Sequence, residues 1–250
     1  MSAADLAVLA VTGVLAGAVN AVAGGGSLIT FPALVATGLS PLTANVTNTI
    51  AQLPGYLSIV EGYRPHLTGQ WPRLRVLLAP TLAGAGAGVA LLHWGGEEAF
   101  EAVVPWLILG ACLLLALGPR LRERIAGREG DGTRLTWGLG LAVLACGAYA
   151  SYFGAAAGVL LLAVLALGVI DGLQRLNALN RVLILVANVA AAPALVGVFP
   201  VDWVAVATLA PATLVGGAVG ARVARRLDDG VLRAVVILIG IGVAGWMLVR

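Results

Sequence analysis

The stretch Asn20-Ala21-Val22-Ala23-Gly24-Gly25-Gly26-Ser27 interrupts an otherwise apolar part of the chain. Three consecutive glycines break a hydrophobic helix, because glycine destabilises a helix interior and allows backbone conformations that other residues avoid. A row of polar side chains follows, and its spacing places the row on one face of a helix: Asn45, Asn48, Thr49, Gln52 and Tyr56. We interpret the two features together as a binding site inside a membrane, built where helices are interrupted.

The composition predicts a membrane protein. Of 250 residues, 60% are hydrophobic and only 11% are charged, and the mean hydropathy is +0.99. Soluble domains carry roughly 25% charged residues, so this chain has too few charges to cover a surface that faces water. The arginines are scattered between apolar segments, which argues against a nucleic-acid surface. The predicted fold class is therefore an all-α integral membrane protein.

Ten hydrophobic segments are expected, in two sets of five, separated by polar or turn-forming residues. They cover residues 6–22, 28–38, 42–60, 76–94, 102–117, 135–152, 153–170, 175–198, 203–224 and 234–249. The second segment contains Pro32 and falls well short of the ~20 residues that a spanning helix needs. This shortness favours a broken or re-entrant helix, although full spans for segments two and seven remain open. Loops are expected at 61–75, 97–101, 120–134 and 222–233.

The two halves of the sequence resemble each other. The pattern Asn-x-x-Asn occurs at Asn45 and again at Asn177, which lies 132 positions later. Pro211 follows Pro80 by 131 positions, and Gly168 follows Gly38 by 130. We interpret residues 1–119 and 135–250 as two repeats, joined by a linker over residues 120–134.

The charges predict how the repeats are oriented. Cytoplasmic loops collect arginine, so the linker from Arg120 to Arg134 and the loop with Arg64, Arg73 and Arg75 are expected inside. The acidic loop at Glu97 is then outside, and so are both termini. Corresponding segments of the two repeats run in opposite directions, as in many secondary transporters. Because Asp5 and no basic residue precedes the first apolar run, a cleaved signal peptide is not expected.

The chemistry of the predicted site favours a small anion over a cation. Interrupted helices expose backbone N–H groups and a positive dipole end, and Arg181 adds a charge whose geometry suits oxyanions. A second such helix end is expected at the small residues Gly154 to Gly158. The predicted substrate-binding residues are Asn20, Gly24, Gly25, Gly26, Ser27, Asn45, Asn48, Thr49, Gln52, Tyr56, Asn177, Asn180, Arg181 and Asn188. The alternatives are that the amides only join helices and that Arg181 extends to the membrane interface.

Several stretches closely resemble the sulfite exporter TauE/SafE permease family. In the first half these are Asn20 to Leu28, Phe31-Pro32 and Thr43 to Thr49, and the second half is similar at Asn177-Ala178-Leu179, Val201-Asp202-Trp203 and Gly220-Ala221-Arg222. The family often has Lys-Asn after Asn-Ala-Leu, where this chain has Asn180-Arg181, and the second glycine cluster is mostly alanine here. The resemblance covers essentially the whole chain. It implies a bacterial inner-membrane permease for sulfur-containing anions such as sulfite, thiosulfate or small organosulfonates.

The sequence therefore predicts a secondary transporter that works by alternating access, with a small anion and the lipid bilayer as its partners. An anion channel with the same site and a non-transporting membrane assembly protein are the alternatives. An enzyme is not expected, because no nucleophile, base or metal cluster is apparent. Cys112 and Cys146 lie in apolar runs without metal-ligand spacing, so no metal or cofactor is expected. The exact substrate, the direction, the coupling ion and the oligomeric state stay open.

Overall fold

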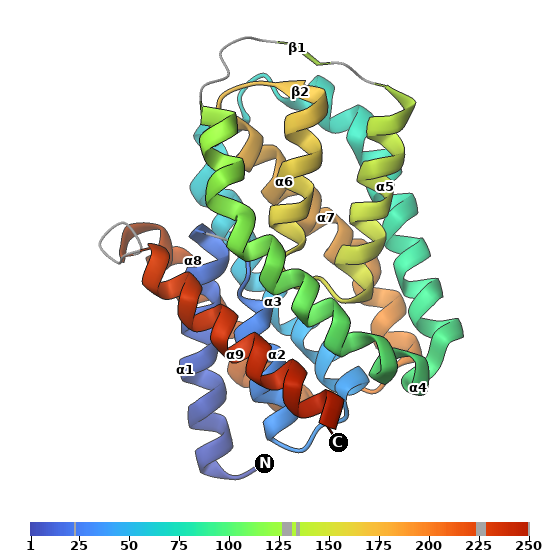
Figure 1. Ribbon diagram of the computed structural model, residues 1–250, viewed down its shortest axis with the longest axis vertical. Coiled ribbons are helices and arrows are strands. Elements are labelled where there is room, and N and C mark those ends of the chain that lie inside the picture. Colours follow the sequence, from blue (N-terminus) through green and yellow to red (C-terminus); the bar gives the residue numbers. More distant parts are fainter. Residues whose placement is uncertain (23, 127–131, 134–135, 224–228, 250) are drawn as a thin grey trace.

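The computed structural model describes residues 1–22, 24–126, 132–133, 136–223 and 229–249, which form a bundle of helices (Figure 1). The elements are α1 (Ala3–Val22), α2 (Ser27–Ala36), α3 (Pro41–Tyr63), η1 (Arg64–Leu67), α4 (Trp71–Ala126), β1 (Gly132–Thr133), α5 (Trp137–Tyr152), α6 (Ala157–Gly168), β2 (Val169–Ile170), α7 (Leu173–Val198), α8 (Trp203–Val223) and α9 (Asp229–Val249). β1 and β2 form one short antiparallel pair. The predicted all-α fold class is confirmed.

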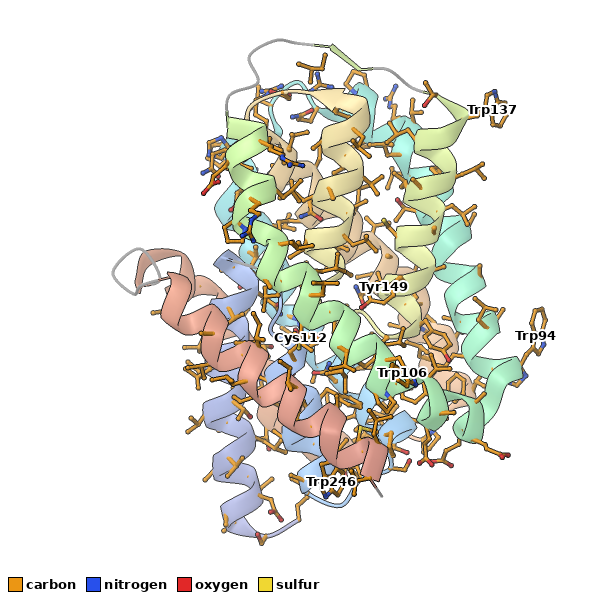
Figure 2. All side chains as sticks on the ribbon, in the orientation of Figure 1. Trp94, Trp106, Cys112, Trp137, Tyr149 and Trp246 are labelled. Carbon is orange, nitrogen blue, oxygen red and sulfur yellow. The ribbon has the colours of Figure 1, made fainter. Side chains whose placement is uncertain are left out.

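Four helices in the described part of the chain are long and apolar enough to cross a membrane. They lie within α1, α4, α7 and α8, while α2, α5, α6 and residues 234–249 are shorter apolar helices. Large apolar side chains face outward, such as Leu167 at 84% exposure. Figure 2 shows Trp137 projecting near one end of the molecule and Trp94 projecting from its side. Tryptophan is enriched where membrane meets water, so this surface fits a lipid environment.

Several helices begin at polar capping residues that the sequence supplies. The Ser40 side chain accepts a hydrogen bond from the Thr43 backbone N–H before α3, and Pro41 occupies the first turn. Asp202 caps α8 by accepting from the Ala205 N–H at 2.8 Å. Its own backbone N–H donates to the Thr47 hydroxyl at 3.0 Å, which joins α3 to the start of α8. Such caps satisfy N–H groups that have no partner within the helix.

The predicted loop at residues 97–101 is wrong. Only Gly96, with φ 67° and ψ −171°, leaves helical geometry, and helical residues continue on both sides of it. α4 therefore consists of two arms that meet in a sharp bend, as Figure 1 shows. Glycine is suited to this bend because it adopts positive φ without strain. The three glutamates follow the bend at the start of the second arm.

Other predicted boundaries also differ from the structure. Residues 120–126 continue the second arm of α4 rather than opening a linker, and residues 132–133 form β1. The remainder of the predicted linker, 127–131 and 134, lies outside the described residues. α6 begins at Ala157, four residues later than expected, and the predicted loop at 222–233 includes the end of α8 and the start of α9. Polar composition marked 120–134 and 222–233 as loops, but helix hydrogen bonding extends into the described parts of both stretches. Residues 153–156, by contrast, lie between α5 and α6 and belong to neither helix.

Two pairs of helices pack at glycine-lined crossings, α1 against α8 and α4 against α5. A Cβ added at Gly216 would lie 2.1 Å from the carbonyl oxygen of Val14, and one added at Gly84 would lie 2.2 Å from that of Leu144. A larger residue at either glycine would force the two helices apart, since its side chain would displace the neighbouring backbone. Each crossing joins a helix of the first half of the chain to a helix of the second.

Candidate functional site

Two helix interruptions lie within the bundle rather than at its ends (Figure 1). The first separates α1 from α2 and contains Gly24, whose φ is +80°. The second separates α5 from α6 and contains Gly154 at φ 77° and Ala156 at φ 55°. The ten-residue α2 spans only about 15 Å at 1.5 Å per residue, about half of the hydrocarbon thickness. Both α2 and α6 are therefore the second parts of broken helices, and each begins inside the protein.

The two interruptions touch each other at Arg181. A Cβ built on Gly24 would lie 3.6 Å from the Cα of Gly158, and 3.2 Å from the Nη1 atom of Arg181. The same Nη1 atom lies 3.2 Å from a Cβ built on Gly158. Arg181 is 4% exposed, so its charge is held inside the protein and does not extend to an interface. The absence of side chains at Gly24 and Gly158 makes room for the guanidinium.

A closed network of hydrogen bonds holds the start of α2. Asn20 accepts from the backbone N–H of Gly26 at 2.8 Å and donates to the Gln52 side-chain oxygen. The Gln52 amide donates to Ser27 at 2.9 Å and to the Oδ1 atom of Asn48 at 2.9 Å. Every amide oxygen among these residues is used within the network. Such buried networks are rigid when every group is satisfied, so this cluster positions the first interruption.

Different contacts hold the second interruption. The Asn45 amide nitrogen donates to the carbonyl oxygen of Tyr152, the last residue of α5, at 2.8 Å. The Asn180 amide nitrogen donates to the carbonyl oxygen of Gly158, in the first turn of α6, also at 2.8 Å. The Tyr149 hydroxyl donates to the carbonyl oxygen of Ala155, within the interruption, at 2.6 Å. Side chains from α3, α5 and α7 thus fix the backbone of this segment.

All fourteen residues predicted for the site are buried. Tyr56 is 9% exposed and belongs to the buried hydrophobic cluster that includes Leu77 and Leu183. Thr49 donates to the carbonyl oxygen of Asn45 within its own helix. Asn188 stands apart, because its amide donates to Ile184 one turn earlier in α7. Contacts at the two interruptions are made by Asn20, Gly24, Gly26, Ser27, Asn45, Asn48, Gln52, Asn180 and Arg181.

Sequence reasoning missed one member of the first network. Thr30 donates to the Oδ1 atom of Asn48 at 2.6 Å and accepts from Gln52 at 3.1 Å. It is a polar residue one turn after Ser27 in a short apolar segment, and this spacing could have revealed it.

A second polar cluster, also missed, lies at the end of the molecule that carries β1 and β2. Asp171 accepts hydrogen bonds from Arg73, from Arg175 at 2.9 Å and from Gln70 at 3.2 Å. Asp171 is 6% exposed and Arg73 is 8% exposed. Burial alone raises the pKa of Asp171, but the hydrogen bonds from the two arginines outweigh burial and hold it below its ordinary value of 3.8. This cluster joins the start of α4 to the start of α7.

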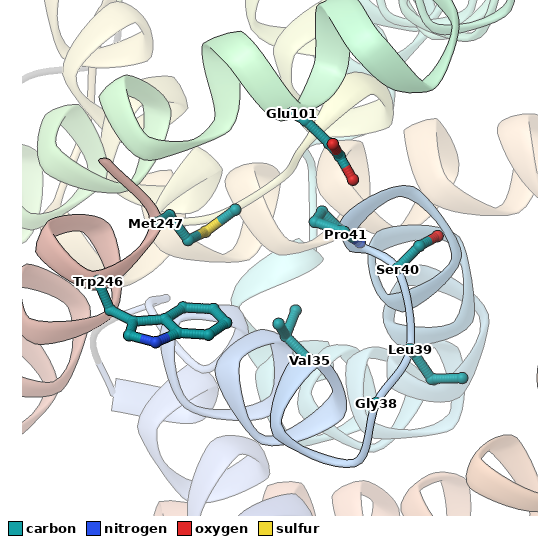
Figure 3. A pocket seen from close by; sticks show the side chains of 8 residues that line it. All are labelled: Val35, Gly38, Leu39, Ser40, Pro41, Glu101, Trp246 and Met247. Carbon is teal, nitrogen blue, oxygen red and sulfur yellow. The ribbon is translucent and has the colours of Figure 1, made fainter. Parts of the chain in front are cut away.

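A cavity of about 550 Å³ opens elsewhere, at the end of α2. Figure 3 shows Trp246 and Met247 of α9, Glu101 of α4 and Val35 of α2 around it. None of its lining residues belongs to the predicted site. In the described part of the chain, no group of three His, Cys, Asp or Glu residues could hold a metal ion.

An apolar helical bundle whose interrupted helices enclose an arginine and a set of amides is built as membrane transporters are. Residues 9–247 match the family model of the sulfite exporter TauE/SafE family, and the chain belongs to this family.

Three relatives illustrate the similarity. A probable membrane transporter protein of Escherichia coli K12, YfcA, is 31% identical over 156 residues, which cover 61% of this chain and 56% of the relative. A probable membrane transporter protein of Haemophilus influenzae is 32% identical over 155 residues, covering 61% and 59%. ORF9 of Sinorhizobium sp, with the same description, is 31% identical over 120 residues, covering 47% and 45%. The matches thus span about half the length of these relatives. No solved structure matches the chain.

Proposed function

We propose that this protein moves a small sulfur-containing anion, such as sulfite, thiosulfate or an organosulfonate, across a bacterial inner membrane. The observation that carries the proposal is the place of Arg181, whose guanidinium lies against Gly24 and Gly158 at once. α2 and α6 begin within three residues of these glycines, so two positive helix ends lie near one buried cation. An anion held there would contact a charge and backbone donors together.

Alternating access between two inverted repeats is the mechanism we propose. Matching contacts in the two halves support it: Gly216 lies 132 positions after Gly84, and each meets a backbone carbonyl of the partner helix. Those carbonyls, of Val14 and Leu144, are 130 positions apart. The first arm of α4 and α8 thus occupy corresponding places. A rocking motion of one repeat against the other would expose a site between them to each side in turn.

The proposed orientation follows the arginines. The end with β1 and β2 carries Arg64 and the buried pair of Arg73 and Asp171, and we assign it to the cytoplasm. The opposite end carries the glutamates after Gly96 and both termini (Figure 1), and we assign it to the periplasm.

Flux into proteoliposomes tests the proposal. The purified chain is expected to move sulfite, thiosulfate or a small sulfonate with saturable kinetics, and Arg181→Ala is expected to abolish saturable flux. Arg181→Lys keeps the charge but loses the fork of donors, so a partial loss is expected. Thr81→Val is the control, because Thr81 is buried in α4 and its hydroxyl donates to the carbonyl oxygen of Leu77 in its own helix.

The outcomes separate the alternatives. Flux that fails to saturate and exceeds transporter rates would indicate an anion channel. Absence of both flux and binding for all three classes of anion would refute the proposed cargo and leave an assembly role.

A further inference from the structure

Three asparagine oxygens near the second interruption have no hydrogen-bond partner among the described residues. They are the Oδ1 atoms of Asn45, Asn177 and Asn180, and each residue is at least nine-tenths buried. By contrast, the oxygens of Asn20, Asn48 and Gln52 at the first interruption all accept hydrogen bonds. The two interruptions are therefore unequal: the first is closed by its own side chains, and the second presents unused acceptors.

The orientation of two of these amides is fixed by their partners. The Asn45 nitrogen donates to the carbonyl of Tyr152, and the Asn180 nitrogen donates to the carbonyl of Gly158. A carbonyl oxygen only accepts, so turning either amide over would place two acceptors together. The unpartnered atom of each amide must therefore be the oxygen.

Two of the three asparagines are hydrogen-bonded to the interruption that borders the position of the proposed anion. Tyr152 and Gly158 bracket the interruption between α5 and α6, so Asn45 and Asn180 hold its two ends. Arg181 follows Asn180 in the chain and contacts Gly158. Asn177 lies one turn earlier in α7, on the same face as Asn180 and Arg181.

An anion that only accepts hydrogen bonds suits Arg181 but not these oxygens. Fully deprotonated sulfite and thiosulfate bring no donor, so they would leave buried acceptors unpaired and place like partial charges together. A ligand with an O–H or N–H group beside its anionic group would satisfy both sets of atoms.

We propose that the site selects anions that carry their own hydrogen-bond donor: a protonated oxyanion, or a sulfonate bearing a hydroxyl or amino group. The anionic head faces Arg181, and the donor faces the oxygens of Asn45, Asn177 and Asn180. The proposal rests on the proposed function, because it assumes that the anion binds at Arg181.

Binding of matched sulfonates to the purified full-length chain tests this selectivity. Ethanesulfonate lacks a donor, 2-hydroxyethanesulfonate adds a hydroxyl, and 2-aminoethanesulfonate adds an ammonium group. Because an unpaired buried acceptor is costly, the two donor-bearing ligands are expected to bind about five- to a hundredfold more tightly than ethanesulfonate. For sulfite, binding is expected to weaken as rising pH removes its proton, while ethanesulfonate binding stays constant over the same range.

Substitution of an acceptor should remove the preference itself. In Asn177→Leu, which keeps the side-chain volume, the affinity ratio between 2-hydroxyethanesulfonate and ethanesulfonate is expected to fall toward one. Asn180→Leu is a second variant with the same expectation, and Thr81→Val should leave the ratio unchanged.

The results separate this inference from the proposed function. Equal binding of all three sulfonates in a manner that needs Arg181 would overturn the donor requirement and leave the anion site standing, with water on the oxygens. Binding of ethanesulfonate that rises with Na⁺ but not with choline would also overturn it, since a cation would then occupy the oxygens. No binding that depends on Arg181 would instead refute the proposed function.

Discussion

Removal of the Asp171 carboxylate should destabilise the protein far more than removal of a surface charge. Asp171 accepts from Arg73 and Arg175 and is nearly inaccessible to solvent. In Asp171→Asn the side chain keeps its shape, but the Arg73 guanidinium, whose side chain is 10% exposed, loses the charge of Asp171. The variant therefore isolates the ion pair from side-chain packing.

The magnitude follows from the burial of each partner. Breaking a buried ion pair by removing one member costs about 3–5 kcal/mol. Arg175 is 37% exposed at its side chain, so water compensates much of its loss, and its share is at most about 1 kcal/mol. The free energy of unfolding is therefore expected to fall by about 3–5 kcal/mol, with Arg73 supplying most of the change.

The pH dependence has a definite sign. Because the folded-state pKa of Asp171 lies below its ordinary value of 3.8, the carboxylate stabilises the fold fully above that value. The contribution is lost as pH falls below 3.8 through the folded pKa. The difference between the wild type and Asp171→Asn should thus be constant from pH 7 to pH 5 and shrink below about pH 4.

Denaturation of the detergent-solubilised protein, followed by tryptophan fluorescence, measures both effects. Glu61→Gln is the matched control, because Glu61 pairs with Arg64 on the surface and both side chains are more than 70% exposed; its expected cost is about 0–1 kcal/mol. If Asp171→Asn and Glu61→Gln lower stability equally, the Asp171 cluster does not stabilise the fold more than a surface ion pair does.

Three further predictions concern single contacts. Gly84→Ala should lower the free energy of unfolding by about 1–3 kcal/mol, since its Cβ would lie 2.2 Å from a backbone oxygen. Gly86→Ala, whose Cβ would have nothing within 4 Å, should be neutral or slightly stabilising. Comparison of the unfolding midpoints of the two variants checks this. Asn20→Ala should cost about 1–3 kcal/mol and speed hydrogen exchange at the Gly26 amide, which loses its acceptor; unchanged protection of that amide would contradict the network. Ser40→Ala should cost about 0.5–1 kcal/mol through the lost cap of α3, measurable as a small shift in the same unfolding curve.

The sequence predicted the broken helices because their cause is local. The three consecutive glycines interrupt the helix whatever contacts the rest of the chain makes. The segment that follows is only ten residues long, which is too short to span the membrane. The amide row was predictable for the same reason, since helical spacing determines which side chains share a face. The predicted site residues are buried together, although their role in binding stays a prediction.

Contacts between distant segments could not be derived from pattern alone. Asp171 lies between two apolar segments, and only the fold brings Arg73, which lies 98 positions earlier in the sequence, against it. The bend at Gly96 was hidden because three nearby glutamates resemble a loop, while a single glycine suffices for the turn. Which amide oxygens lack a hydrogen-bond partner also depends on distant residues, because the amide nitrogens of Asn45 and Asn180 donate to carbonyl groups more than 20 residues away in the sequence.

The crossed packing of the helices has a consequence for biosynthesis. α1 lies against α8, and α5 lies against α4, so each half of the chain completes its packing only with a helix from the other half. When the ribosome has made the first half of the chain, the glycine face of α1 still lacks its partner helix. This face stays unpaired in the bilayer until α8 has been synthesised. In a fragment that stops before α8, Gly13 and Gly17 are therefore expected to face lipid instead of the α8 backbone.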